Sequence, residues 1–354
     1  MNATSPSLPR SAPLSSSAQT AYAQLLDAAH AADLARSVAD LPGTFARKQV
    51  KGRTYWYYQV VDVGGRQRQI YVGPENDRVL ALVERSAGDS ARPALQGLAQ
   101  SAIALGNAPM LPKHFKVVQR LADHGFFRAG GILVGTHAFL AYGNMLGVRW
   151  ADGQRTQDVD LAHAGKAVSL ALPADVEINV HDALESLQMG LLPLMGATGA
   201  GATYLDPKDP EFQIDFLTPL HRGGMKPYRH EKLGITLQPL KFMEFSLQDV
   251  QQAAVFAGSG VAVVNVPHPA RFALHKLLVA GERPASRIAK SNKDVLQAAA
   301  LLSVLVETVN DAVGEAWADL MQRGPGWRTR AMQGKAALMR VAPELDVRTL
   351  LADQ

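Results

Sequence analysis

The sequence contains no cysteine, which excludes disulfide scaffolds, thiolate zinc sites and cysteine nucleophiles. This absence fits a reducing compartment, and we expect a cytoplasmic protein. No apolar run approaches the ~18 residues that a membrane-spanning helix needs, so no membrane partner is expected. Charged residues make up 19% of the 354 residues and hydrophobic residues 47%. This is ordinary globular composition and excludes wholesale disorder.

The excess of positive charge is concentrated in one segment. The formal net charge of the chain is +4. Between Arg47 and Arg78 there are seven basic residues and three acidic ones, so this segment carries seven minus three, or +4, and the rest of the chain sums to zero. A localised basic surface favours a polyanionic partner more strongly than a diffuse excess does.

Composition and periodicity divide the chain into four parts. Residues 1–19 are rich in Ser, Pro and Ala and are expected to form a disordered tail. Residues 20–110 are predicted to form a helical module that carries a β-hairpin. Helices and short strands alternate over 111–270, the predicted core, and 271–354 is predicted to be helical. Residues 191–201, LLPLMGATGAG, are predicted to be a mobile loop.

The predicted hairpin is aromatic and basic. Residues 53–61 and 67–72 are rich in aromatic and β-branched types and flank Gly64-Gly65, as is typical of a hairpin. Successive strand residues face opposite sides, so part of the aromatic run at 55–58 stays open beside arginines. Aromatic rings stack on bases, and arginines bind phosphates. The alternative is a hairpin that only packs. We predict nucleic-acid or partner binding through Arg53, Tyr57, Tyr58, Arg66 and Arg68.

A glycine turn and a pair of aspartates suggest a phosphate and metal site. In VGTH, 134–137, a buried strand runs through Gly135 into a helix, whose first N–H groups can bind a phosphate. In DVDL, Asp158 and Asp160 alternate with apolar residues, so both carboxylates project from one face of a strand. Two such carboxylates repel unless a cation or proton neutralises them, and Mg²⁺ prefers carboxylate and phosphate oxygens.

Two further features accompany this pair. Asp215 is an acid within the strand-like run EFQIDFL, with Ile214 and Phe216 on the opposite face. A buried carboxylate is costly unless it is paired or metal-bound, so Asp215 is a candidate third acid; pairing with an arginine such as Arg222 is the alternative. His137 is expected to be a packed histidine. The second feature is a cationic set of helical residues, and the alternative is that they form a solvated helix face. The set comprises Lys276, Arg283, Arg287, Lys290 and Lys293, beside Asp294.

Together these residues resemble the nucleotidyltransferase-fold superfamily, whose pattern is a glycine followed by a small hydroxyl residue, a DxD strand and a third acid. The resemblance is to an uncharacterised bacterial nucleotidyltransferase-fold family and, more distantly, to the AbiEii and MenT-like toxin nucleotidyltransferases. Thr136 stands where serine is commoner, and the gap from Gly135 to Asp158 is long. The stretches that carry the resemblance span roughly 130–302 and are GGILVGTHAFLAYGNMLGVRW, TQDVDLA, QIDFLTP, VPHPARFALHKLLV and KSNKDVLQAAALL.

The resemblance implies an α/β (α+β) fold with a mixed sheet, an N-terminal hairpin and helical module, and a C-terminal helical region. It implies transfer of a nucleoside monophosphate from an NTP to an acceptor hydroxyl of RNA, tRNA or a protein, with Mg²⁺ or Mn²⁺. An antitoxin-like protein is a further candidate partner. The alternatives are a non-catalytic nucleotide- or nucleic-acid-binding protein and an antibiotic-modifying transferase. The resemblance assigns catalysis and metal binding to Asp158, Asp160 and Asp215, and nucleotide binding to Gly135, Thr136, Lys276 and Lys293.

Overall fold

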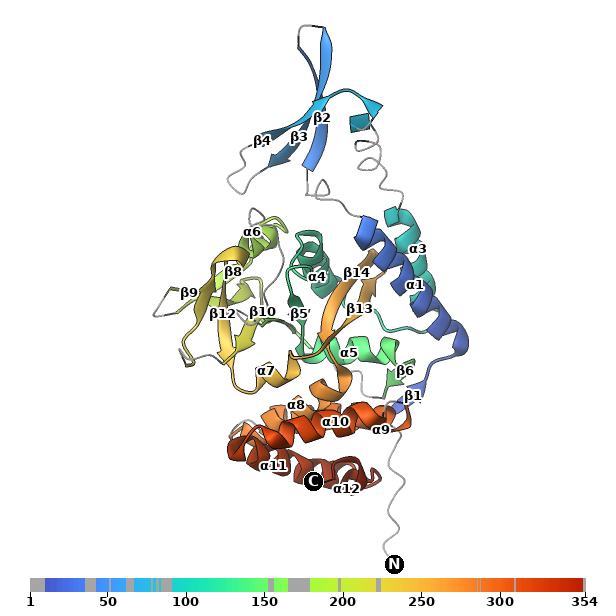
Figure 1. Cartoon of the computed structure of the whole chain (residues 1–354), viewed down its shortest axis with the longest axis vertical. Helices are drawn as coiled ribbons and strands as arrows, with labels where there is room; N and C mark the ends of the chain where they lie inside the picture. The colour runs from blue at the N-terminus through green and yellow to red at the C-terminus, as the bar shows by residue number, and fades with distance from the viewer. Residues whose placement is uncertain are drawn as a thin grey trace, which may run out of the picture.

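The chain folds into a mixed α/β body with helices at its C-terminal end, as the sequence predicts (Figure 1). A separate three-stranded sheet stands at the opposite end of the molecule. The computed structural model describes residues 10–35, 43–50, 52–61, 67–77, 79–80, 83, 91–151, 156–164, 179–196, 199–220, 224–284, 286, 288–308 and 310–352.

A seven-stranded mixed sheet forms the centre of the body. Strand β10 pairs in parallel with β7 on one side, and with β12 and antiparallel β9 on the other. Strands β5, β11 and β8 extend the sheet in antiparallel fashion. The strands are β5 (Gly131–Leu133), β7 (Asp158–His163), β8 (Leu192–Gly196), β9 (Gly199–Asp206), β10 (Asp209–Pro219), β11 (Tyr228–His230) and β12 (Ile235–Leu240).

Strands β8 and β9 correct the prediction of a mobile loop over 191–201. The glycine-rich composition of this segment weakens its own strand preference. The ladder that β9 forms with β10 nevertheless supplies hydrogen-bond partners, and β8 then pairs with β9. Residues 197–198 lie outside the described part of the chain. Pairing with a distant strand has therefore overridden local propensity here.

The expectation of a disordered tail is wrong for residues 10–19. Strand β1 (Ser11–Pro13) pairs with β6 (Val148–Trp150), and helix α1 (Ser16–Ala35) begins three residues later. Leu14 is only 7% exposed, and Arg10 binds Glu344 with an Nε–Oε1 distance of 2.9 Å. Contacts with segments far along the chain therefore order a stretch whose composition favours disorder. Residues 1–9 lie outside the described residues.

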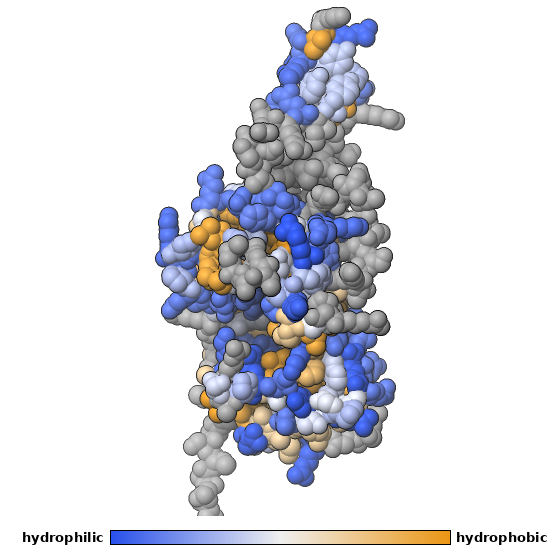
Figure 2. Space-filling view, turned by 90° about the vertical axis from the view of Figure 1, so that its left-hand side faces the viewer, coloured by the Kyte–Doolittle hydropathy of each residue, from blue (hydrophilic) through white to orange (hydrophobic). Residues whose placement is uncertain are grey.

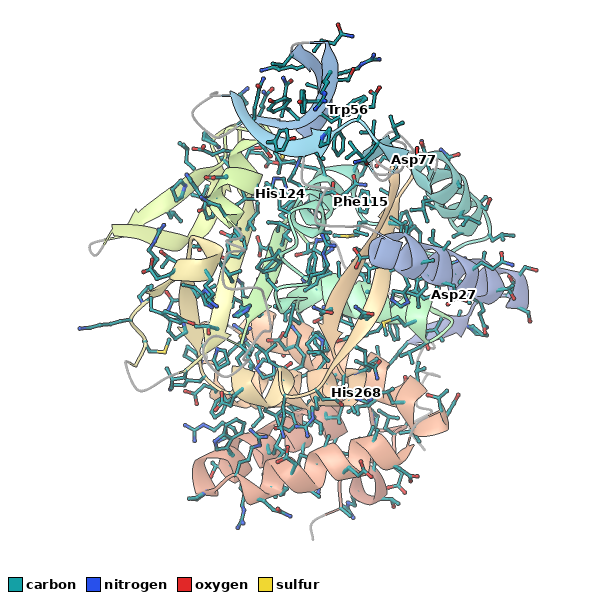
Figure 3. The ribbon with its side chains drawn as sticks, turned by 45° about the horizontal axis from the view of Figure 1, so that its top comes forward. Asp27, Trp56, Asp77, Phe115, His124 and His268 are labelled. Atoms are coloured by element: carbon teal, nitrogen blue, oxygen red, sulfur yellow. The ribbon has the colours of Figure 1, made fainter. Side chains whose placement is uncertain are left out.

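The aromatic hairpin forms as predicted and gains a third strand. Strands β3 (Arg53–Val61) and β4 (Gln67–Pro74) pair antiparallel, and β2 (Gly43–Val50), which the sequence analysis did not predict, pairs with β3. The Gly64-Gly65 turn lies outside the described residues. Trp56 marks this sheet in Figure 3.

Helices and a second hairpin surround the central sheet. Strands β13 (Val250–Ala257) and β14 (Gly260–Pro267) pair with each other beside α1 and α3 (Figure 1). Among the described residues, no helix is long and apolar enough to cross a membrane. The helices are α3 (Ala91–Ala104), α4 (Pro112–Asp123), α5 (Gly135–Met145), α6 (Val180–Glu185), the 3-10 helix η3 (Glu231–Leu233), α7 (Met243–Ser246), α8 (Pro269–Glu282), α9 (Ile288–Thr308), α10 (Asn310–Gln322), α11 (Pro325–Val341) and α12 (Val347–Leu350).

Candidate active site

Three aspartates share one face of the central sheet. The parallel register of β7 and β10 aligns Asp160 with Asp215, and Asp158 precedes Asp160 by two residues on the same strand. Because strand side chains alternate, the three carboxylates project from the same side. The residues that alternate with them along the two strands, Val159 and Phe216 among others, are 0% exposed and point into the core beneath. The sequence pattern had predicted both alternations, and the tertiary fold brings them together.

The three carboxylates interact electrostatically. Burial, the Asp215 charge and the Asp158 charge raise the pKa of Asp160 to about 6, against the opposing effect of Lys276 and Lys290. Burial also raises the pKa of Asp215, and the nearby charge of Asp158 adds to the effect. Like charges in a low-dielectric environment disfavour ionisation, so this cluster is a place where a cation would be stabilised.

The third acid, Asp215, has one polar neighbour on the adjoining strand and one on its own strand. The Thr203 hydroxyl on β9 donates a hydrogen bond to Asp215 Oδ1, and Gln213 Nε2 lies 3.5 Å from Asp215 Oδ2. The Thr203 hydrogen bond stabilises the ionised carboxylate and opposes the increase in its pKa. Arg222, the alternative partner from the sequence, lies outside the described residues.

Gly135 lies directly against Asp160. Its φ is +62°, and a β-carbon built at this position would lie 2.0 Å from Asp160 Oδ2. The adjacent Val134 N–H donates to the Asp160 carbonyl at 3.0 Å. Only glycine meets both demands, the left-handed backbone and the close approach. The first residues of α5, Gly135 and the buried Thr136, are thereby placed next to the aspartates.

Lysines from α8 and α9 lie within electrostatic range of the carboxylates. Lys276 donates to Asp294 at 2.8 Å, and Arg283 binds the other oxygen of this buried carboxylate at 2.9 Å. Burial and the Lys276 charge lower the pKa of Lys293, while Asp294, Asp160 and Asp158 oppose this. Lys276 and Lys293 are therefore within electrostatic range of the aspartates, whereas Arg287 lies outside the described residues.

The sequence analysis placed Lys290 in the cationic helical set without a role of its own, and it did not name Thr203. Lys290 acts on both Asp160 and Asp215, as the pKa of each shows. Its spacing of three residues from Lys293 on one helix was a usable signal, because residues three apart share a helix face. Thr203 gave no such signal, because its position opposite Asp215 depends on the pairing of β9 with β10.

A buried histidine pair lies behind the start of α5. His114 Nδ1 and His137 Nε2 are 2.8 Å apart, and both side chains are 2% exposed. Burial lowers the pKa of His114 to about 4 and that of His137 to about 3, so both are neutral at pH 7. His137 is thus a packed histidine, as expected from the sequence, and it fixes the helix that carries Thr136.

The acidic side chains of this face are the candidate ligands of a divalent cation. Among the described residues, no group of three or more His, Cys, Asp or Glu side chains is arranged to hold a metal by itself. Mg²⁺, however, is usually held by one or two carboxylates together with substrate phosphates. Asp158 and Asp160 fit that second arrangement, because they lie on the same strand face. The raised pKa of Asp160 shows that its charge is not balanced in the free protein.

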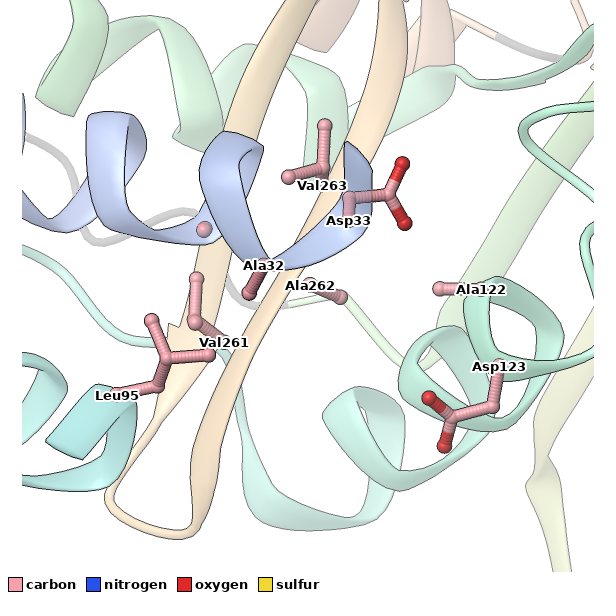
Figure 4. A pocket seen from close by; sticks show the side chains of 9 residues that line it. Ala32, Asp33, Leu95, Ala122, Asp123, Val261, Ala262 and Val263 are labelled. Carbon is pink, nitrogen blue, oxygen red and sulfur yellow. The ribbon is translucent and has the colours of Figure 1, made fainter. Parts of the chain in front are cut away.

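A small hollow elsewhere on the body does not fit a nucleotide. It lies between α1, α3, α4 and β14 and has about 20 Å³ of space, close to that of a single water molecule (Figure 4). Its walls are mostly apolar, and the aspartates described above do not line it. The residues that line this hollow are Ala29, Ala32, Asp33, Leu95, Ala122, Asp123, Val261, Ala262 and Val263.

The predicted nucleic-acid residues do not all share a face of the three-stranded sheet. Alternation places Arg53 and Tyr57 on one side of β3, with Tyr58 at an alternate position. Tyr58 pairs with Ile70, and Val60 pairs with Arg68. Tyr58 and Arg68 therefore occupy positions of the other face, opposite to that of Arg53 and Tyr57. Arg66 lies outside the described residues.

Comparison with known proteins identifies a family. Residues 113–322 match a family model described as Nucleotidyltransferase. No curated protein matches the chain. A solved structure of an antigenic nucleotidyltransferase-like protein from Paracoccidioides brasiliensis is 16% identical over 64% of this chain and 95% of its own, with a TM-score of 0.30. At this TM-score the likeness does not bear on the fold.

Proposed function

The chain belongs to the nucleotidyltransferase family, and on that premise we propose that it transfers a nucleoside monophosphate from an NTP to an acceptor hydroxyl, releasing pyrophosphate. The observation that carries the proposal is the register of β7 and β10, which aligns Asp160 with Asp215 and keeps Asp158 on the same face. The start of α5 and the lysines of α8 and α9 adjoin this face.

Asp158 and Asp160 would hold Mg²⁺, or Mn²⁺, together with the triphosphate. When bound, the cation would stabilise the charge that develops on the phosphate oxygens. Asp160 lies buried beside two other acids, which disfavours its ionised form in the free protein. The cation bound with the substrate would bring the positive charge that stabilises this carboxylate. Gly135 permits this approach, because any side chain at its position would displace Asp160.

The terminal phosphates would lie at the start of α5. The N–H groups of Gly135 and Thr136 belong to the first turn of an 11-residue helix, where unpaired N–H groups and the helix dipole favour an anion. Lys293 and Lys276 would neutralise the phosphate charge from the opposite side. The hydrogen bond from Lys276 to Asp294 holds the lysine ammonium group in place. The Asp294 carboxylate is itself buried.

Asp215 would activate the acceptor. The acceptor oxygen forms a bond to the α-phosphorus, the bond to pyrophosphate breaks, and the hydroxyl proton passes to Asp215. A carboxylate whose pKa is raised by burial is a better proton acceptor than an exposed one. The Thr203 hydroxyl binds Oδ1, so the proton would pass to Oδ2, whose contact with Gln213 Nε2 is long at 3.5 Å. On the resemblance to the AbiEii and MenT-like transferases, we also propose that an antitoxin-like protein binds this protein and controls its activity.

A transfer assay tests this function. The protein is incubated with each NTP labelled at the α-phosphate, with Mg²⁺ or Mn²⁺ and total RNA, and acid-precipitable label is counted on RNA and on protein. We expect Asp158→Asn and Asp215→Asn to lower transfer at least about 100-fold, as the loss of electrostatic catalytic groups does. Asp27→Asn, on the exposed side of α1, should leave transfer unchanged (Figure 3).

Two results would contradict the proposal. One is transfer that persists in Asp158→Asn at close to the unchanged rate. The other is complete absence of label with every NTP, while labelled NTP still binds the protein in filter binding. The second result would favour a non-catalytic nucleotide-binding protein of the same fold.

A further inference from the structure

The three-stranded sheet has one aromatic, basic face, here called the tyrosine face. The pairing of β2, β3 and β4 places on it Tyr55, Tyr57 and Tyr71, with Lys48 opposite Tyr55. Arg53 continues the same alternation at the start of β3. Among the strand positions described, this alternation brings no aspartate or glutamate to the face. This sheet also lies outside the residues that match the family model.

The tyrosines form a contiguous aromatic surface. The ring of Tyr71 lies 5.6 Å from that of Tyr57 and 6.2 Å from that of Tyr55, measured between centroids. Tyr71 is 55% exposed, a high value for a tyrosine. Lys48 Nζ lies 5.0 Å from the centre of the Tyr57 ring and donates to Gln69 Oε1, so it is held over the surface. Figure 2 shows a pale patch on this sheet bordered by strongly hydrophilic residues.

The opposite face differs in its charge balance. Trp56 Nε1 donates to Glu75 Oε2 at 2.9 Å, and Arg47 Nε lies 3.7 Å from the same carboxylate. Trp56 and Arg47 therefore share an acidic partner, Glu75, directly after the end of β4. Lys48 and Arg53, in contrast, are exposed and have no acidic partner among the described residues. The tyrosine face therefore carries two exposed cations without an acidic partner among the described residues.

We propose that the tyrosine face binds single-stranded RNA, and that this RNA is the acceptor of the proposed transfer. The inference rests on the proposed function only in its second part. Bases stack on exposed aromatic rings of an antiparallel sheet, and nearby cations bind the phosphates between them. Tyr71, with its ring 5.6 Å from that of Tyr57 and 6.2 Å from that of Tyr55, joins the rings into a support for adjacent bases. The tyrosine hydroxyls and the Gln69 amide supply polar groups for the 2′-hydroxyl, which distinguishes RNA from DNA.

Binding is measured apart from catalysis. A fluorescein-labelled, unstructured RNA of about 12 nucleotides, within the range that such platforms cover, is titrated with the full chain in EDTA without NTP, and anisotropy is recorded at about 50 mM and 200 mM salt. The same sequence as DNA and as duplex RNA serves for comparison. We expect single-stranded RNA to bind most tightly and its affinity to fall with salt.

Matched variants locate the surface. Tyr71→Ala should weaken RNA binding about five- to 150-fold, the loss expected for one stacked base, whereas Tyr71→Phe keeps the ring and most of the affinity. Lys48→Gln should weaken binding and lower the salt slope by about one. Arg47→Gln removes the same charge from the next residue, on the other face, and should have little effect. Circular dichroism checks that each variant is folded.

The outcomes separate this proposal from the proposed function. Equal losses in Lys48→Gln and Arg47→Gln, or wild-type affinity in Tyr71→Ala, would overturn the tyrosine face. Equal or tighter binding of DNA would overturn the assignment to RNA. Transfer of label to an acceptor by a protein that does not bind RNA would refute the inference and leave the transferase intact. RNA binding that depends on Tyr71 and Lys48, without any transfer, would support the surface and refute the transferase.

Discussion

Asp160→Asn should stabilise the free protein at neutral pH. The pKa of Asp160 is raised to about 6 by burial and by the charges of Asp215 and Asp158, so at pH 7.5 the folded chain carries a carboxylate it disfavours. The gap from an ordinary aspartate is about two pH units. At about 1.4 kcal/mol for each unit, the ionised group costs the folded state about 3 kcal/mol. Asparagine has nearly the same shape and removes that charge.

The gain in stability from Asp160→Asn should depend on pH. Below the pKa of an ordinary aspartate, both the folded and the unfolded chain hold the proton, and the cost is absent. It grows as the pH rises toward the folded pKa of about 6 and is complete above that value. The advantage of Asp160→Asn over the wild type should therefore be full at pH 7.5 and vanish near pH 4.

Thermal unfolding measures this advantage. At about 2.1 cal/mol/K of unfolding entropy per residue, the full 3 kcal/mol corresponds to an increase in Tm of about 4 °C for this chain. Asp27→Asn, an exposed aspartate on α1, is the control and should change stability by less than about 0.5 kcal/mol. A Tm advantage that is equal at pH 4 and pH 7.5, or a loss of stability at pH 7.5, would refute the electrostatic reasoning.

Three further predictions concern the surroundings of the aspartates. Gly190→Ala should lower the free energy of unfolding in urea by about 1–2 kcal/mol, because its φ of +71° strains any side chain. Gly135→Ala should lower it more, because the new β-carbon would also collide with Asp160. Equal losses in the two variants would contradict this close approach. Asp294→Ala should destabilise by about 3 kcal/mol, since two cations lose their buried partner, and a change under 1 kcal/mol would show the pair is dispensable. His137→Gln should lose less stability than the wild type as the pH falls from 6.5 to 4, because burial lowers the pKa of this histidine to about 3 and its folded form resists protonation; parallel pH profiles would contradict this.

The fold class and the faces of the key strands followed from local pattern. Alternation in DVDL and EFQIDFL predicts which side chains are buried, and Val159, Ile214 and Phe216 are indeed 0% exposed. The mixed α/β architecture, the glycine before α5 and the aromatic hairpin were likewise readable, because each depends on residues close together in the chain. The residue roles assigned to the aspartates and lysines stay predictions.

Some features could not be read from sequence, because they depend on pairing between distant segments. The segment 191–201 has the composition of a loop, yet β10 gives its strands a ladder to join. Residues 10–19 resemble a tail, yet β6 and Glu344 supply their partners. On the hairpin, Tyr58 was as good a candidate as Tyr57 until the pairing of β3 with β4 placed Tyr71 beside Tyr57.

The sequence by itself determined that Asp158 and Asp160 share a strand face and that Asp215 lies on the polar side of its own strand, because a strand turns its side chains alternately whatever it pairs with. Only the tertiary structure decided that these two faces are the same one. Parallel pairing of β7 with β10 joins residues more than fifty positions apart, and a shift of one residue in the register of either strand would have turned its carboxylates into the core. The neighbouring glycine and lysines then act on those aspartates through distance and burial, which local sequence does not set.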